Sequence, residues 1–384
     1  MTGAAPGPAS GPTQGPASGP EATAPDPLAD RRMLADRRML ADRRMLAAVR
    51  RIGLGRRLLV TGVLVLVLVV LACLALVLGD RVLAPGDVVA SLLGLGSGGD
   101  NFVVQGLRLP RLTLGLLVGA AFGLAGAVFQ SLLGNPLASP DIIGISQGAS
   151  AAAVGAILVL GWAGIAVSFA AFAGAVVVAG LITILATRNG VAGSRFVLIG
   201  IALAFLAQAL IGYLLTRADV REAQSALVWL VGSIGTVKGE EIAVTAVAGL
   251  VLSIGLILLA PRLRMLQLGD ETAAGLGVRV TPTRLLLTLV AVGFAAVATA
   301  AAGPVAFVAF VAAPIARRLL GGAGTATALV ASALVGAVVV TGADIIAQHA
   351  FPGLQVPVGI VTGIVGAPIL LGLLARGNRT RGTA

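Results

Sequence analysis

Residues 58–78 read LLVTGVLVLVLVVLACLALVL and contain no charged side chain. A transmembrane α-helix needs about 20 mostly apolar residues, and runs of this kind recur along the chain. Their continuous apolarity differs from the alternating pattern of a membrane β-barrel. Of the 384 residues, 58% are hydrophobic and 11% are charged, and the mean hydropathy is +1.02. The sequence therefore predicts an all-α, polytopic membrane protein.

Breaks at glycine, proline and charged residues divide the chain into about ten predicted transmembrane helices. Their ranges are 58–79, 112–133, 146–160, 163–187, 195–216, 242–260, 283–302, 304–320, 326–347 and 357–375. The third and the eighth are short, so a count of eight or nine spans stays open.

The distribution of basic residues predicts the orientation of the spans. If both termini are cytoplasmic, all but six of the 27 Lys and Arg residues lie on the cytoplasmic side, as the positive-inside rule favours. The six on the other side are Arg81, Arg108, Arg111, Arg217, Arg221 and Lys238. The net charge of +11 then reflects topology and contact with anionic lipid, and argues little for nucleic acid binding.

The first 57 residues are expected to form a disordered, basic cytoplasmic tail. They include the hexapeptide ADRRML three times in succession at 29–46. Six residues of helix advance about 600°, so the repeats do not build one apolar stripe. We interpret them as a repeat expansion or as the sign of a misplaced start. The alternatives for the first residue are Met1, Met33, Met39 and Met45. A second cytoplasmic tail is expected at 377–384.

Residues 266–278 read LQLGDETAAGLGV and form a polar island between two apolar blocks. Asp270 is predicted to cap the N-terminus of a short helix, and Gly275 and Gly277 are predicted to end it. The topology above places the island in the cytoplasm. It is either a docking element or a plain connector.

Charged residues on the external side raise a separate question. Arg108 and Arg111 are three positions apart, which on a helix would place them on one face. They are either interfacial anchors or ligands for a partner carboxylate. Asp344, near the outer end of the ninth span, is favoured as a structural, hydrogen-bonded or water-facing carboxylate over a proton relay.

The chain lacks the residues expected of an energy-converting enzyme. The phosphate-binding pattern Gly-x-x-x-x-Gly-Lys-Ser/Thr does not occur, and Lys238 is the only lysine. ATP is therefore expected to be hydrolysed by another protein. No catalytic residues are predicted. One histidine, His349, without clustered carboxylates, and one distant cysteine, Cys73, predict no metal site.

Seven short motifs occur in order between 108 and 368. They are Arg108-Leu-Pro-Arg111, Gly119-Ala120 with Gln130, Asn135-Pro-Leu-Ala138 with Pro140, Leu268-Gly-Asp-Glu-Thr-Ala273 with Leu276-Gly-Val278, Ala302-Gly-Pro304 with Phe307-Val308, Pro357-Val-Gly-Ile-Val-Thr362, and Gly366-Ala-Pro368. Together they resemble the FecCD-type permeases, the membrane subunits of ABC importers for iron–siderophores, haem and cobalamin. The resemblance covers nearly everything except the N-terminal tail and makes 58–376 the permease domain.

The resemblance implies roles for matching residues. Arg108 and Arg111 would bind glutamates of an extracytoplasmic substrate-binding protein. Contact with an ATP-binding cassette ATPase dimer, which binds ATP and Mg, would involve Leu268, Gly269, Asp270, Glu271, Thr272, Ala273, Gly275, Leu276 and Gly277. The cytoplasmic gate would consist of Val191, Ala192, Gly193 and Ser194. Other motif residues of interest are Asn135 and Pro136.

The resemblance also implies a pathway and a substrate class. Translocation would run between two permease protomers, identical or paralogous, along residues 198–215 of the fifth span. Gln348 stands where the cobalamin-type member has a docking arginine, which favours an iron–siderophore. The alternatives are cobalamin or haem in the same family, and a stand-alone proton-coupled transporter that uses Asp344. The chain itself is expected to bind no cofactor and to lie in the inner cell membrane.

Overall fold

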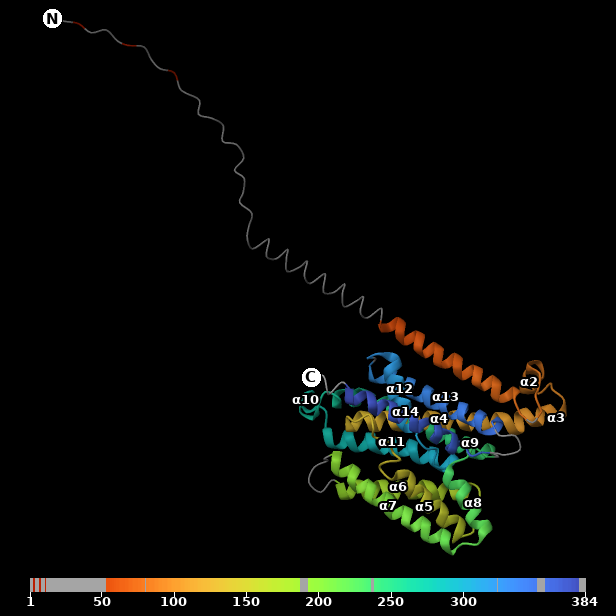
Figure 1. The fold of residues 1–384 in the computed structure, drawn as a ribbon. Coiled ribbons are helices and arrows are strands. Elements are labelled where there is room, and N and C mark those ends of the chain that lie inside the picture. Colours follow the sequence, from red (N-terminus) through yellow and green to blue (C-terminus); the bar gives the residue numbers. More distant parts are fainter. Residues whose placement is uncertain are drawn as a thin grey trace. The chain divides into compact units, whose positions relative to one another are not determined.

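The computed structural model describes residues 53–79, 81–186, 193–235, 238–322, 324–350 and 356–379, together with Gly3, Gly7 and Gly11. Most of the predicted N-terminal tail, its repeat and its alternative start residues lie outside this set. The chain divides into two units, Met1–Leu54 and Gly55–Ala384. The second unit carries the fold (Figure 1).

Within the described residues the regular structure is entirely helical (Figure 1). After the helix Gly53–Val77, the elements are α2 (Pro85–Leu92), α3 (Gly98–Asn101), the π-helix η1 (Phe102–Arg108), α4 (Leu109–Leu133), α5 (Ile145–Leu158), α6 (Ile165–Ala186), α7 (Gly193–Arg217), α8 (Val220–Val231), α9 (Gly239–Leu266), α10 (Asp270–Gly275), α11 (Val280–Ala302), α12 (Val308–Leu320), α13 (Thr325–His349) and α14 (Val358–Arg379).

Each of the ten predicted spans coincides with one helix, which confirms the all-α membrane fold. Seven helices in the described part are long and apolar enough to cross a bilayer. They are Gly53–Val77, Gly98–Leu133, Ile165–Ala186, Arg195–Arg217, Gly239–Leu266, Val280–Ala302 and Thr325–His349. Helices α5, α12 and α14 also match predicted spans, but α5 and α12 are short, with 14 and 13 residues. A count of ten crossings and the cytoplasmic termini remain predictions.

Helix α4 lies at the centre of the core and packs against α11, α12 and α13. Three of its glycines allow this close approach. A Cβ on Gly126 would overlap the carbonyl oxygen of Ala309 in α12. On the neighbouring turns, Gly119 and Gly123 face the backbone of α13 in the same way. Small residues of this kind let membrane helices pack backbone to backbone.

Helix α7 contrasts with α4 because much of its apolar surface is exposed. Leu198, Phe205, Leu206 and Tyr213 are all more than half exposed. The helix packs on α5 and α6, which form a second group of helices in Figure 1. Its outer face therefore has no cover within the described chain.

The segment 134–144 between α4 and α5 is not helical and lies against α7. Gly144 has a φ of 87°, a left-handed conformation that glycine adopts without strain. A Cβ on Gly200 of α7 would overlap the carbonyl oxygen of Ile143. The loop thus contacts α7 about two turns from the start of that helix.

Candidate functional site

The N-terminal end of α4 is held by a bidentate ion pair. Nε and Nη2 of Arg111 donate to the carboxylate oxygens of Asp344 on α13 at 3.0 and 2.8 Å. Nε2 of Gln348 donates to the same carboxylate at 2.7 Å. The Asp344 side chain is 9% exposed. Asp344 is therefore a hydrogen-bonded carboxylate that joins α13 to the start of α4.

Arg108 has different partners from Arg111. Its guanidinium donates to the carbonyl oxygens of Leu76 at 2.6 Å and Val77 at 3.1 Å, at the end of the first helix, and to that of Arg81 at 2.5 Å. The π-helix ends at Arg108, and α4 begins at the next residue. The two arginines fix different neighbours of α4.

The polar island folds as the short helix α10, but Asp270 does not cap it. Gly269, with a φ of 102°, occupies the capping position, and Asp270 is the first helical residue. The positive φ of Gly269 makes the turn through the backbone, which leaves the Asp270 carboxylate free to accept from Nη2 of Arg284 at 2.6 Å. Gly277, with a φ of 85°, follows the helix, as predicted.

Most of the predicted coupling residues are exposed on α10 and its flanks. Ala273 alone among them is buried, and it anchors the helix to the main core. Leu268 and Leu276, one on each side of α10, are 62% and 57% exposed. The exposed members of this set are Leu268, Gly269, Asp270, Glu271, Thr272, Gly275, Leu276 and Gly277.

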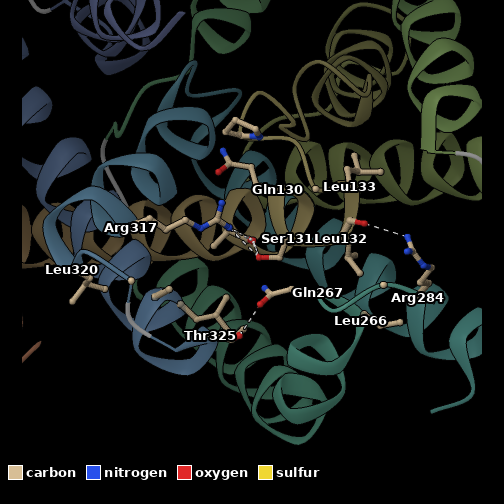
Figure 2. Close-up of a pocket in the computed structure, with 17 residues that line it drawn as sticks. Gln130, Ser131, Leu132, Leu133, Leu266, Gln267, Arg284, Arg317, Leu320 and Thr325 are labelled. Atoms are coloured by element: carbon tan, nitrogen blue, oxygen red, sulfur yellow. Dashed lines mark hydrogen bonds between the residues drawn. The ribbon is translucent and has the colours of Figure 1, made fainter. Parts of the chain in front are cut away.

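Arg284 connects this helix to the core. While Nη2 holds Asp270, Nη1 donates to the carbonyl oxygen of Leu132 at 3.1 Å, at the C-terminal end of α4 (Figure 2). One guanidinium on α11 therefore joins α10 to α4. A displacement of α10 would act directly on the end of the central helix.

A cavity of about 700 Å³ lies beside this junction (Figure 2). Its lining includes Arg284, Arg317, Gln130 and Pro136. Sequence reasoning missed the cavity, because its walls come from separate helices. Two features of the sequence could have revealed it: a glutamine inside the apolar α4 and the paired arginines at the end of α12.

The structure shows fewer contacts for the remaining predicted residues. The side chain of Asn135 accepts from the backbone N–H of Leu137 at 2.9 Å and forms a turn after α4. Gly193 and Ser194 begin α7, whereas Val191 and Ala192 of the predicted gate lie outside the described residues. A search of the described chain finds no group of three or more His, Cys, Asp or Glu residues placed to hold a metal ion.

Comparison with known proteins identifies the family. The model of the FecCD transport family matches residues 66–376. The ferric enterobactin transport system permease protein FepG of Escherichia coli K12 is 39% identical over 328 residues, which are 85% of this chain and 98% of the relative. The Fe(3+)-citrate import system permease protein YfmE of Bacillus subtilis 168 is 37% identical over 320 residues, 83% of this chain and 95% of the relative.

Other matches show the range of the family and its fold. The vitamin B12 import system permease protein BtuC of Citrobacter koseri is 34% identical over 322 residues, 83% of this chain and 93% of the relative. A solved structure of a putative metal-chelate type ABC transporter in an inward-facing conformation superposes with a TM-score of 0.72 at 28% identity and covers 83% of this chain and 99% of that chain. The chain therefore belongs to the FecCD transport family and is a multi-pass permease of the inner cell membrane.

Proposed function

We propose that this permease carries a ferric chelate of the siderophore class into the cell as the membrane subunit of an ABC importer. The observation that carries the proposal is α10, an exposed helix that Arg284 ties to the central helix α4. A transport protein driven by a separate motor needs a contact that connects the motor to the core. The siderophore class follows from the names of relatives such as FepG and YfmE.

ATP and Mg would bind to a separate ATPase dimer, and this chain would bind no cofactor. The ATPase would contact the exposed face of α10, with Leu268 and Leu276 as apolar contacts on either side. Because the Arg284 guanidinium reaches both α10 and α4, ATPase movement would reach the core through one side chain. Gly193, Ser194 and the two residues before them would form the cytoplasmic gate.

A substrate-binding protein would dock at the other end of α4, near Arg108 and Arg111. A second permease protomer would cover the exposed apolar face of α7 and complete a path along residues 198–215. Both expectations rest on family resemblance, and the uncovered face of α7 supports the second.

The proton-coupled alternative is disfavoured by the surroundings of Asp344. Arg111 and Gln348 already donate to its carboxylate oxygens. A relay needs a carboxylate oxygen that is open to a proton donor, whereas these two side chains already occupy the Asp344 oxygens. Gln348 stands where the cobalamin-type member has a docking arginine, and this difference favours a siderophore over cobalamin as the substrate.

Transport of labelled ferric siderophore in proteoliposomes tests the proposal. The permease is reconstituted with its ATPase and binding protein, and uptake is compared with uptake of cobalamin and haem. We expect uptake of the ferric chelate that requires ATP and is insensitive to a protonophore. Uptake that continues without the ATPase, or is abolished by the protonophore, would contradict the proposal.

Docking is tested by charge reversal. Arg108→Glu/Arg111→Glu should abolish the stimulation of ATP hydrolysis by the binding protein, and reversal of the partner's glutamates should partly restore it. Arg221→Glu, an exposed reversal on α8, is the matched control. Because Glu at 111 would also face Asp344, Arg111→Gln separates lost docking from local repulsion. Stimulation that survives the double reversal would leave the arginines with structural roles alone.

A further inference from the structure

The cavity of Figure 2 has a charge that the permease fold does not compensate. Nη2 of Arg317 donates to Oγ of Ser131 at 3.0 Å and to the carbonyl oxygen of Ala127 at 3.4 Å. No carboxylate within the described chain forms an ion pair with it. Positive charge at a cavity wall favours an anionic ligand.

Arg284, on the opposite side of the cavity, adds a second guanidinium (Figure 2). Its charge is shared with Asp270, but its Nε is buried and makes no hydrogen bond. A buried donor without an acceptor is costly, so this group also calls for an anion or another acceptor. Phosphate and carboxylate oxygens would both satisfy it.

Gln130 distinguishes between these two anions. It is 1% exposed, and its Nε2 donates to the carbonyl oxygen of Phe310 at 3.1 Å. Its Oε1 is buried and receives no hydrogen bond. A carboxylate would leave this acceptor unsatisfied. A ligand that offers a donor as well as anionic oxygens would satisfy it.

The rest of the lining is mixed. Gln267 and Thr325 are polar, and five leucines add apolar surface. They are Leu132, Leu133, Leu266, Leu320 and Leu329. A polar site bounded by leucines suits a molecule with a charged head and an apolar remainder, and about 700 Å³ is within the range of small-molecule sites.

We propose that this cavity binds the headgroup of an anionic phospholipid whose phosphodiester carries a free hydroxyl, as in phosphatidylglycerol. The phosphate oxygens accept from Arg317 and Arg284, and the hydroxyl donates to Oε1 of Gln130. Basic pockets between transmembrane helices on the cytoplasmic side are typical sites for such lipids. The positive-inside orientation predicted above supplies that side.

The site goes beyond transport of a chelate because it places lipid beside the coupling helix. Gly269, which precedes α10, lines the same cavity. Bound lipid would support the Arg284 junction between α10 and α4. Lipid composition would then affect the strength of the contact between α10 and α4.

Lipid selectivity of the full chain tests the proposal. Spin-labelled phosphatidylglycerol and phosphatidylcholine are compared in phosphatidylcholine bilayers, and the motionally restricted fraction measures binding. Arg317→Gln should lower the preference for phosphatidylglycerol about fivefold. Arg318→Gln, the exposed neighbour outside the cavity lining, is the matched control and should retain the preference. Equal preference in wild type and Arg317→Gln would overturn the proposal.

The fold, the charge and the hydroxyl are tested separately. Thermal unfolding of both variants checks the fold, and Arg317→Lys, which keeps the charge, should retain part of the preference. Phosphatidylmethanol has the same charge as phosphatidylglycerol without its hydroxyls and should bind more weakly. Equal binding of these two lipids would overturn the role of Gln130.

Two additions test the source of the anion. Soluble glycerophosphoglycerol should not displace the labelled lipid, and displacement would indicate a site for soluble phosphodiesters. If Arg317→Gln weakens ATPase binding in pure phosphatidylcholine while lipid selectivity is unchanged, an acidic ATPase side chain occupies the cavity and the lipid proposal fails.

Discussion

The two ends of α4 are each tied to another helix by an arginine and an aspartate, and the two pairs differ in burial. At the N-terminal end, which the predicted topology makes the outer one, Arg111 and Asp344 are 23% and 9% exposed. At the C-terminal end, the predicted inner one, Arg284 is equally covered, but Asp270 is 54% exposed. A buried pair is costly to separate, whereas water readily replaces an exposed partner. The outer pair therefore suits a fixed joint and the inner pair a movable one.

Removal of the outer carboxylate should have the largest effect on stability. Asp344→Ala leaves Arg111 without its partner and should lower the free energy of unfolding by about 3–5 kcal/mol. Thermal and denaturant unfolding in detergent measure the loss. Adding Arg111→Leu removes the unpaired charge and should recover part of it. A double variant no more stable than the single one would contradict a buried, charge-paired joint.

The middle of α4 should respond less strongly but clearly. Gly126→Ala would place a methyl group against the Ala309 carbonyl and should cost about 1–3 kcal/mol by forcing α4 and α12 apart. Gly212→Ala in α7 is the control, because a Cβ there meets no atom within 4 Å. Unfolding of both variants under one set of conditions gives the comparison. Similar stability for the two would show that the α4 contact tolerates expansion.

Loss of the inner pair should change coupling more than stability. Asp270→Ala should cost at most about 1 kcal/mol, yet it should raise the ATP hydrolysed per chelate transported. Glu222→Ala, an exposed acid on α8, is the control. Exchange of the two charges in Asp270→Arg/Arg284→Asp should not restore the coupling, because an Asp at 284 cannot donate to the carbonyl oxygen of Leu132. If Asp270→Ala leaves the ATP hydrolysed per chelate unchanged, the Arg284–Asp270 pair does not couple the ATPase to α4.

The smallest expected effect is that of salt. Because Asp270 is exposed, higher ionic strength should weaken its attraction to Arg284 and reduce coupling modestly. The buried Arg111–Asp344 pair should be much less affected. Coupling ratios measured over a salt series in wild type and Asp270→Ala test this. Equal salt sensitivity of the two proteins would assign the effect to other charges.

Hydropathy predicted where the helices lie because each long apolar run must satisfy its backbone internally. It could not predict which charges pair. Arg111 and Asp344 are 233 positions apart, and both were recognised only as unusual groups on the external side. The packing of α4 against α13 brings them together, and no local pattern encodes that contact.

The local error at the island has a different origin. Asp270 has the side chain of a good N-cap, and the prediction followed that preference. Gly269 instead turns the chain through its backbone, and Asp270 pairs with a residue 14 positions later. The cavity beside it was missed because its polar lining, including Gln130, Arg284 and Arg317, comes from different helices.

The loop 134–144 has a consequence for how the chain enters the membrane. Its contact with Gly200 lies about seven residues into α7, about 10 Å along that helix. Backbone carbonyls at such a depth need protein around them, because lipid offers no hydrogen bonds. The 14 residues of α5 reach only about 21 Å. We therefore expect residues 134–158 to settle only after α7 has been synthesised and inserted, so that a later helix completes the crossing of an earlier one.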